Sequence, residues 1–263
     1  MKKTLSLLIT AALIVSFAAG CGSDGKSEDH DPVTITVAAA ASLEDTYKNK
    51  LIPLFNEKYP WITVEGTYDS SGKLQTQIEE GLQADIFMSA AEKQMTALSE
   101  SGFINPESVV NLLENEIVLI APINSQTTVK SFSEIGNAET IAIGDPASVP
   151  AGQYAQEALT SLGVWESIQS KTSFGTNVTE VLNAVAEGSA DLGIVYATDA
   201  AQMTDKVKVI ASAPDGSLKS KVIYPAGILA KAPHPDEAKI FLDFLKSKEA
   251  LEIFKENGFK SNL

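Results

Sequence analysis

Arginine is absent from this sequence: its twenty basic residues are all lysines, and they face 34 aspartates and glutamates. The formal net charge is −14. Nucleic-acid binding requires a basic surface, so this composition argues against nucleic acid as a partner. If the chain binds an anion, neither a guanidinium clamp nor long-range attraction can hold it, and uncharged donors must do so.

Cysteine and histidine are also scarce. Cys21 is the only cysteine, so neither an intramolecular disulfide nor a cysteine cluster for a metal can form. Of the two histidines, His30 stands in a polar N-terminal stretch and His234 stands between two prolines. Neither position favours a histidine-based catalytic triad or metal site.

The N-terminal residues have the pattern of an export signal. Lys2 and Lys3 precede an apolar run of 15 residues, Leu5–Ala19, which is too short to cross a bilayer as a mature helix. The sequence AAGC at 18–21, where this run gives way to Gly20 and Cys21, resembles a bacterial lipobox, although leucine is usual where Ala18 stands. We predict a signal peptide over residues 1–20, and a lipidated Cys21 that begins a flexible tether over residues 21–32. The protein would then be extracytoplasmic and lipid-anchored to the cell membrane; the alternative is a cleaved, soluble secreted protein.

Short apolar segments alternate with amphipathic segments over most of the remaining chain. Strands are predicted over residues 34–41, 62–68, 84–90, 116–121, 140–144, 191–197 and 207–211, and helices over residues 42–59, 71–81, 92–101, 151–162, 177–187 and, as a pair, 235–256. This alternation predicts an α/β fold with parallel sheets. Because no linker divides the chain, we expect lobes that are joined by crossing strands.

Four predicted strand-to-helix turns share one chemistry: AAASL at 39–43, DSSGKL at 69–74, GDPASVPAG at 144–152 and GTNV at 175–178. Each presents unpaired backbone N–H groups where a helix begins, and the first two add a hydroxyl. Such groups bind small anions without formal positive charge. Ordinary helix capping is the competing interpretation, with Ser42 and Asp45 as a capping box and Ser71 as an N-cap. Lys73 favours an anion weakly, because a cation is unfavourable in a helix's first turn.

Two enzyme-like patterns overlap the second turn. Residues 70–73 match the S-x-x-K nucleophile motif of penicillin-recognising enzymes, but the S-D-N and K-T-G partners of that motif are missing. Gly72 and Lys73 also hint at a phosphate-binding loop, but Leu74 replaces the required serine or threonine. A secreted serine enzyme that uses Ser70 or Ser71 is therefore kept only as a distant alternative.

Five segments, in order along the chain, together resemble the molybdate-binding proteins of ABC transporters. They are AAASL at 39–43, SSGKL at 70–74, ADIFMSA at 84–90, GDPASVPAGQYA at 144–155 and GIVYATDA at 193–200, and the similarity covers the chain from about Val33 onward. The resemblance implies a bilobal periplasmic-binding-protein fold of type II, closing on a tetrahedral oxyanion. It also implies a ligand-binding set that consists of the hydroxyls of Ser42, Ser71 and Tyr196 and the backbone N–H groups of Ser42, Ser71, Ala151 and Val178.

The expected organisation follows from this resemblance. Residues 33–115 and 213–263 would form the first lobe, and residues 116–212 the second. The expected partners are molybdate or tungstate, an ABC transporter permease, and the membrane through the N-terminal lipid anchor; we expect a monomer. The resemblance also implies a protein that is not an enzyme, has no cofactor and offers no direct protein ligand to a metal, because molybdate would be held through its oxygens. The same fold binding sulfate or another oxyanion is the nearest alternative, since the sequence does not give the radius of the cavity.

Overall fold

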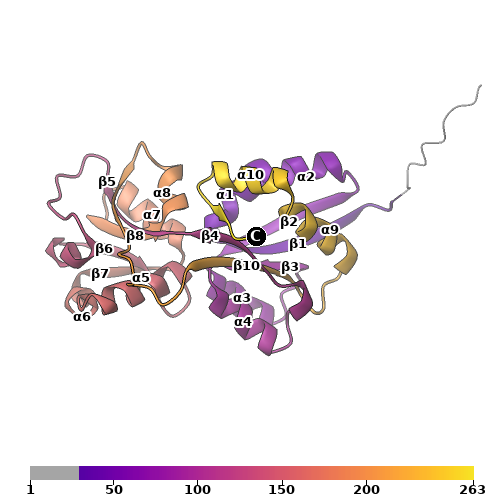
Figure 1. Ribbon diagram of the computed structural model, residues 1–263, viewed down its shortest axis with the longest axis horizontal. Coiled ribbons are helices and arrows are strands. Elements are labelled where there is room, and N and C mark those ends of the chain that lie inside the picture. The colour runs from indigo at the N-terminus through magenta and orange to yellow at the C-terminus, as the bar shows by residue number, and fades with distance from the viewer. Residues whose placement is uncertain (1–29) are drawn as a thin grey trace, which may run out of the picture. The chain divides into compact units, whose positions relative to one another are not determined.

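A computed structural model describes residues 30–263 of the chain. The predicted signal peptide, Cys21 and most of the predicted tether lie outside these residues. Within the described part, Pro32–Leu263 form one compact unit with two β-sheets, each flanked by helices (Figure 1). No helix among the described residues is both long enough and apolar enough to span a bilayer.

The first sheet has six strands in the order β11-β4-β10-β3-β1-β2. Its strands are β1 (Val33–Ala40), β2 (Ile62–Asp69), β3 (Ile86–Met88), β4 (Val110–Asn115), β10 (Val222–Ile228) and β11 (Lys260–Ser261). β1 pairs in parallel with β2 and β3, whereas β10 is antiparallel to both β3 and β4. The last four residues of β1, from Val37 to Ala40, are all buried, as an apolar strand inside a covered sheet should be.

The second sheet has five strands in the order β7-β6-β8-β5-β9. Its strands are β5 (Ile117–Pro122), β6 (Ile141–Gly144), β7 (Thr172–Gly175), β8 (Leu192–Tyr196) and β9 (Val207–Ser212). β6 is parallel to β7 and β8, and β5 runs antiparallel to β8 and β9. Every residue of β8 is buried, which fits its central position.

Helices surround each sheet. Around the first sheet lie α1 (Glu44–Thr46), α2 (Ile52–Lys58), α3 (Ser71–Glu79), α4 (Glu92–Glu100), α9 (Pro235–Leu245) and α10 (Lys248–Glu256), with the short 3-10 turns η1 (Ala41–Leu43) and η3 (Pro106–Ser108) and the π-helical segment η2 (Tyr47–Leu51). Around the second lie α5 (Pro150–Ser161), α6 (Trp165–Ile168), α7 (Val178–Ala186) and α8 (Ala197–Gln202), with the 3-10 turns η4 (Phe132–Asn137) and η5 (Gln169–Lys171).

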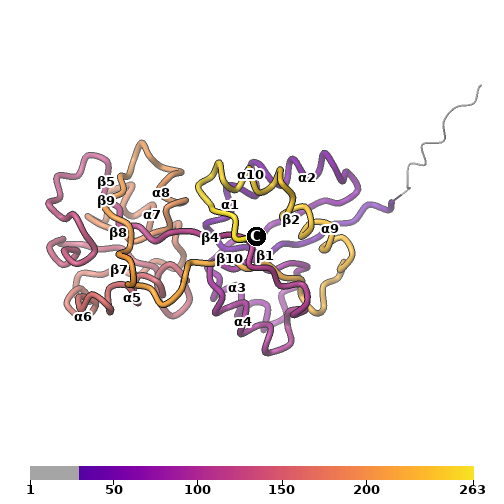
Figure 2. The backbone as a smooth tube through the Cα atoms, viewed as in Figure 1, coloured from indigo at the N-terminus to yellow at the C-terminus, as the bar shows by residue number. Residues whose placement is uncertain are grey.

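The C-terminal helices return to the N-terminal part of the chain, as the backbone trace in Figure 2 shows. Aromatic side chains hold them there: the Phe241 ring meets the Phe55 ring edge-on with centroids 4.8 Å apart, and Phe254 packs 6.2 Å from Tyr47. Such pairs add about 0.5–1.5 kcal/mol beyond the area they bury. The first sheet and its helices thus combine both ends of the described chain.

The predicted α/β alternation is confirmed, but the prediction of parallel sheets is wrong. Both sheets are mixed, because the strands next to the crossings between them, β4, β5, β9 and β10, pair antiparallel. The chain crosses between the sheets at residues 115–117 and again at residues 212–222. The strand–helix–strand units on both sides of these crossings keep parallel pairing. Their strands end where helices begin, which is the usual place for a ligand site.

Candidate functional site

The five residues that the sequence predicts as ligand-binding line one buried cavity. Each is at most 4% exposed: Ser42, Ser71, Ala151, Val178 and Tyr196. Ala40, Ala41, Ser70, Ala90, Val149 and Pro150 complete the lining. The lining therefore comes from the ends of β1 and β8, the segment after β3, and the starts of η1, α3, α5 and α7.

Ser42 lies one residue inside the first turn after β1. The strand ends at Ala40, which is the N-cap of η1, so Ser42 occupies the second position of η1 and its side chain makes no capping bond. The predicted capping box with Asp45 is therefore wrong, and the Asp45 carboxylate instead accepts from the Asn49 side chain. The Ser42 hydroxyl lies 3.0 Å from the Tyr224 hydroxyl.

Ser71 is the first residue of α3, and the predicted N-cap role falls to its neighbour. Ser70 is the N-cap, and its hydroxyl accepts from the Lys73 backbone N–H at 3.4 Å. Ser71 Oγ instead accepts the Ala90 backbone N–H at 2.9 Å. Lys73 has a local anion, since its Nζ lies 3.4 Å from an Asp69 carboxylate oxygen, so its position in the first turn does not require a bound ligand.

Ala151 and Val178 belong to the first turns of α5 and α7. A backbone N–H in a first helical turn has no carbonyl one turn back, so it remains available to an acceptor in front of the helix. Pro150 at the first position of α5 lacks an N–H in any case. The cap of α7 is Asn177, whose side chain accepts from the Glu180 N–H at 3.0 Å and leaves the Val178 N–H uncovered.

A close approach of two glycines fixes the start of α5. A Cβ built on Gly152 would lie 1.9 Å from the Gly144 carbonyl oxygen, and one built on Gly144 would lie 2.5 Å from Val149. The glycines in the GDPASVPAG segment therefore bring the helix against the end of β6. This packing carries the Ala151 N–H to the edge of the sheet.

Tyr196 ends β8 and is the N-cap of α8. Its backbone N–H donates to the Asp199 carboxylate at 3.1 Å, and its hydroxyl donates to the Ala90 carbonyl at 3.3 Å. Burial raises the pKa of Tyr196 well above its usual value, so the phenol keeps its proton. Burial also raises the pKa of Asp199 to about 7, although the bond from the Tyr196 N–H opposes this shift.

Several contacts cross from the first sheet's surroundings to the second's beside the cavity. The Gly72 backbone N–H donates to the Ser148 carbonyl at 2.9 Å, in addition to the bond from Tyr196 to Ala90. Gln94 donates to Gln153 at 3.2 Å. The cavity that these contacts enclose has a volume of about 10 Å³, on the scale of one water molecule. A tetrahedral oxyanion is larger than this volume, so the walls of the cavity would have to move apart to admit one.

The chemistry of the cavity is that of neutral donors. No lining residue carries a charged side chain. Two serine hydroxyls and the amides at helix starts could together surround an anion, and the Tyr196 phenol could join them by exchanging its bond to the Ala90 carbonyl. In a site closed to water, hydrogen bonds to a charged ligand are worth about 1.5–3 kcal/mol each, so a few such donors suffice for tight binding.

Neither Ser70 nor Ser71 has the surroundings of a nucleophile. The Ser70 hydroxyl accepts from a backbone amide, and so does that of Ser71. A serine nucleophile needs a general base within hydrogen-bond reach, and the nearby Lys73 is paired with Asp69. Among residues 30–263 there is also no cluster of three or more His, Cys, Asp or Glu side chains that could hold a metal ion.

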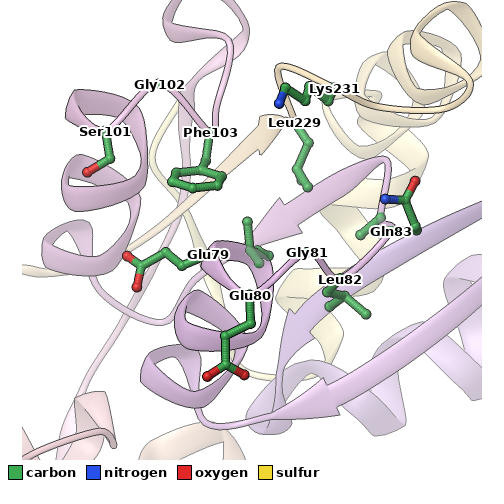
Figure 3. Close-up of a pocket in the computed structure, with 12 residues that line it drawn as sticks. Glu79, Glu80, Gly81, Leu82, Gln83, Ser101, Gly102, Phe103, Leu229 and Lys231 are labelled. Atoms are coloured by element: carbon green, nitrogen blue, oxygen red, sulfur yellow. The ribbon is translucent and has the colours of Figure 1, made fainter.

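A larger pocket lies elsewhere, between the C-terminal ends of α3 and α4 (Figure 3). Its volume is about 400 Å³, and it shares no lining residue with the buried cavity. Glu79 and Glu80 line it, and Lys231 is its only basic residue. This charge balance does not favour an anion, so the smaller cavity is the better candidate for an oxyanion site.

Sequence reasoning missed the residues behind Ser42. Tyr224 on β10, Asn115 at the end of β4 and Thr198 on α8 form a buried hydrogen-bonded group with Ser42. No motif marks them, and Pro225 obscures the strand that carries Tyr224. Only the pairing of β10 with β4 brings them together.

Comparison with known proteins places this architecture in a family. An ABC transporter substrate-binding lipoprotein, as it is named, of Bacillus subtilis is 39% identical over 98% of this chain and 99% of its own length. The molybdate-binding protein of Escherichia coli is 36% identical over 98% of both chains. The solved periplasmic molybdate-binding protein of Azotobacter vinelandii covers 86% of this chain and 98% of its own, with a TM-score of 0.75; at 24% identity it shows a common fold alone.

The two mixed sheets with their helices have the bilobal type II periplasmic-binding-protein fold, as predicted. A family profile of bacterial extracellular solute-binding proteins matches residues 35–260, which is nearly all of the described chain. This chain therefore belongs to the bacterial extracellular solute-binding protein family.

Proposed function

We propose that this protein captures molybdate or tungstate outside the cytoplasm and delivers it to the permease of an ABC importer. The observation that carries the proposal is the convergence of uncharged donors from both lobes on one buried cavity. Ser42 and Ser71 approach from the first lobe, and Ala151, Val178 and Tyr196 approach from the second. The full-length similarity to molybdate-binding relatives supports the same ligand.

The division into lobes is part of this proposal. We assign residues 33–115 and 213–263 to the first lobe and residues 116–212 to the second. Membership of the two sheets supports this division, because β4 ends at Asn115 and β9 ends at Ser212. A bound oxyanion would bridge the lobes and stabilise their contact, so that the permease could distinguish the loaded form.

The membrane attachment is proposed from the sequence and from a relative. Cys21 would carry the lipid, the polar segment after it would act as a tether, and the domain would work as a monomer. The Bacillus subtilis relative is named as a lipoprotein, which supports the anchor. Cys21→Ser should move the protein from the membrane fraction to the soluble fraction, whereas unchanged membrane association would contradict the anchor.

Calorimetric titration with molybdate, tungstate, sulfate and phosphate in parallel tests the ligand. We expect molybdate and tungstate to bind far more tightly than sulfate, and phosphate hardly at all. Hydrogen phosphate carries a proton that needs an acceptor, and the lining offers chiefly donors. Sulfate binding that equals or exceeds molybdate binding would overturn the molybdate assignment and leave the family and fold intact.

The serine-enzyme alternative has a separate test. A serine-reactive phosphonate should leave the protein unlabelled, because Ser70 and Ser71 both accept hydrogen bonds from backbone amides and neither contacts a base. Labelling that disappears in Ser71→Ala would instead favour an enzyme.

A further inference from the structure

A buried chain of hydrogen bonds runs from the strand crossing to Ser42. The Asn115 amide nitrogen lies 2.9 Å from Thr198 Oγ1 and 3.2 Å from Tyr224 Oη, and Tyr224 Oη lies 3.0 Å from Ser42 Oγ. All four side chains are buried. Only Ser42 reaches the cavity, so the other three residues stand behind the predicted ligand-binding set.

The direction of this chain is fixed at Asn115. The Glu116 backbone N–H lies 2.8 Å from Asn115 Oδ1, and a backbone N–H can only donate. Oδ1 is therefore the acceptor end of the amide, and the NH₂ group faces Thr198 and Tyr224. Since an NH₂ group can only donate, the Tyr224 oxygen accepts from it.

Because the Tyr224 oxygen accepts from Asn115, its proton can be donated to Ser42. Burial raises the pKa of Tyr224 well above its usual value, so the phenol remains protonated and can donate. Ser42 Oγ lies 3.0 Å from Tyr224 Oη and can accept this proton. The ring is held in place between Tyr196 and Phe259, with centroids 5.5 and 5.4 Å away.

Donation from Tyr224 determines what Ser42 can do. Ser42 Oγ accepts from the Tyr224 phenol, so the Ser42 proton is free to be donated to a second partner on the cavity side. A hydroxyl that accepts one hydrogen bond is also a stronger donor for the next. Ser71 has the same arrangement, because the Ala90 backbone N–H occupies its acceptor side at 2.9 Å.

We propose that Tyr224 is a positioning residue that aims the Ser42 proton into the cavity, so that Ser42 donates to the bound oxyanion and does not accept from it. This inference rests on the proposed function and extends it to specificity. A fully deprotonated dianion accepts from every donor, whereas hydrogen phosphate must place its own proton on an acceptor. Because the Ser42 and Ser71 oxygens each already accept one hydrogen bond, both serines favour donation, which disfavours a protonated oxyanion.

Tyr224→Phe tests the inference, because it removes the phenolic oxygen and keeps the ring between Tyr196 and Phe259. By calorimetry we expect molybdate affinity to fall about 3- to 10-fold, the range for one neutral hydrogen bond. The ratio of molybdate to phosphate affinity should also shrink, since the Ser42 oxygen becomes free to accept. Tyr47→Phe is the matched control: Tyr47 is equally buried, bonds to the Met88 sulfur and does not line the cavity, so its affinity should be unchanged.

A double-mutant cycle with Ser42→Ala separates positioning from folding. If Tyr224 acts through Ser42, Tyr224→Phe should change molybdate affinity less than about 2-fold in the Ser42→Ala background. An equal loss in both backgrounds would overturn the positioning role. Asn115→Ala is a second test of the positioning role, because it frees the Tyr224 oxygen to accept from Ser42. Its loss of molybdate affinity should likewise depend on the presence of Ser42.

The outcomes also separate this inference from the proposed function. If the wild-type protein binds neither molybdate nor tungstate, the proposed function fails and the role of Tyr224 fails with it. If the wild type binds molybdate and the Tyr224→Phe protein binds it equally well with an unchanged ratio to phosphate, only the inference about Tyr224 fails.

Discussion

Replacing Val178 with proline deletes one backbone N–H at the cavity and leaves the surrounding backbone in place. Val178 is the first residue of α7, where proline is well tolerated. The preceding residue, Asn177, already has the extended conformation that a residue before proline prefers, with φ of −154° and ψ of 173°. The capping bond of α7 is unaffected, because Asn177 accepts from Glu180 and not from Val178.

The size of the effect follows from the chemistry of the lost bond. A hydrogen bond to a charged group contributes about 1.5–3 kcal/mol, so molybdate affinity should fall about ten- to a hundredfold or somewhat more in Val178→Pro. Val178→Ala keeps the N–H and removes two buried methyl groups. Its cost should appear in the free energy of unfolding, at about 1–3 kcal/mol, with affinity almost unchanged.

Calorimetry and urea unfolding on the same samples separate the two effects. Both variants should lose similar stability, because both lose the valine side chain, and only the proline variant should lose affinity. An alanine variant as defective in binding as the proline variant would refute the reasoning, since the side chain would then be the contributing group. A proline variant that binds normally would also refute it.

Three further predictions concern charge and packing. Because the pKa of Asp199 is raised to about 7 and that of an unfolded Asp is about 3.9, the native state binds more protons between these values. The free energy of unfolding should therefore fall as pH rises from about 4 to about 7, by at most about 4 kcal/mol. In urea titrations Asp199→Asn should abolish this fall, and an unchanged dependence of the unfolding free energy on pH would exclude Asp199 as its source. Gly152→Ala should lower the melting temperature strongly, because the added Cβ would meet the Gly144 carbonyl. Gly136→Ala, whose added Cβ would have its nearest neighbour at 3.8 Å, should be tolerated in the same thermal scan. Equal melting temperatures of the two variants would contradict the close packing at Gly152. Since the chain carries a net charge of −14, added sodium chloride screens its repulsion of the dianion. Molybdate affinity should stay unchanged or rise slightly, and association measured by stopped-flow fluorescence should become faster. A steep loss of affinity would instead implicate a lysine, first of all Lys73.

The sequence predicts the strand-to-helix turns of this fold well, because they carry the strongest local signals. The predicted strand over residues 34–41 is found at Val33–Ala40, and the predicted helix over 71–81 at Ser71–Glu79. The assignment of caps failed by two residues at Ser42, where Ala40 is the N-cap, and by one residue at Ser71, where Ser70 is the N-cap. Ser70 and Ser71 are chemically equivalent in the sequence, and only the end of β2 at Asp69 decides which of them caps the helix.

Other parts of the fold have no local signal that could predict them. β10 contains Pro225, which argues against a central strand, yet the register shifts between Tyr224 and Pro225 and so accommodates the proline. β11 is only two residues long. Tyr224 and Asn115 come together through pairing across more than a hundred residues, and the sequence gives no pattern for such a contact.

The position of β10 also has a consequence for how the chain reaches its folded state. The second sheet is built entirely from one continuous stretch, Ile117–Ser212, whereas β10, which fills the middle of the first sheet between β3 and β4, comes from Val222–Ile228. Until this late segment inserts, β3 and β4 each keep an unpaired edge, and such edges favour aggregation. Closing so long a loop is slow relative to local folding, so insertion of β10 should limit the folding rate. The partly folded chain should be most prone to aggregate just before β10 inserts.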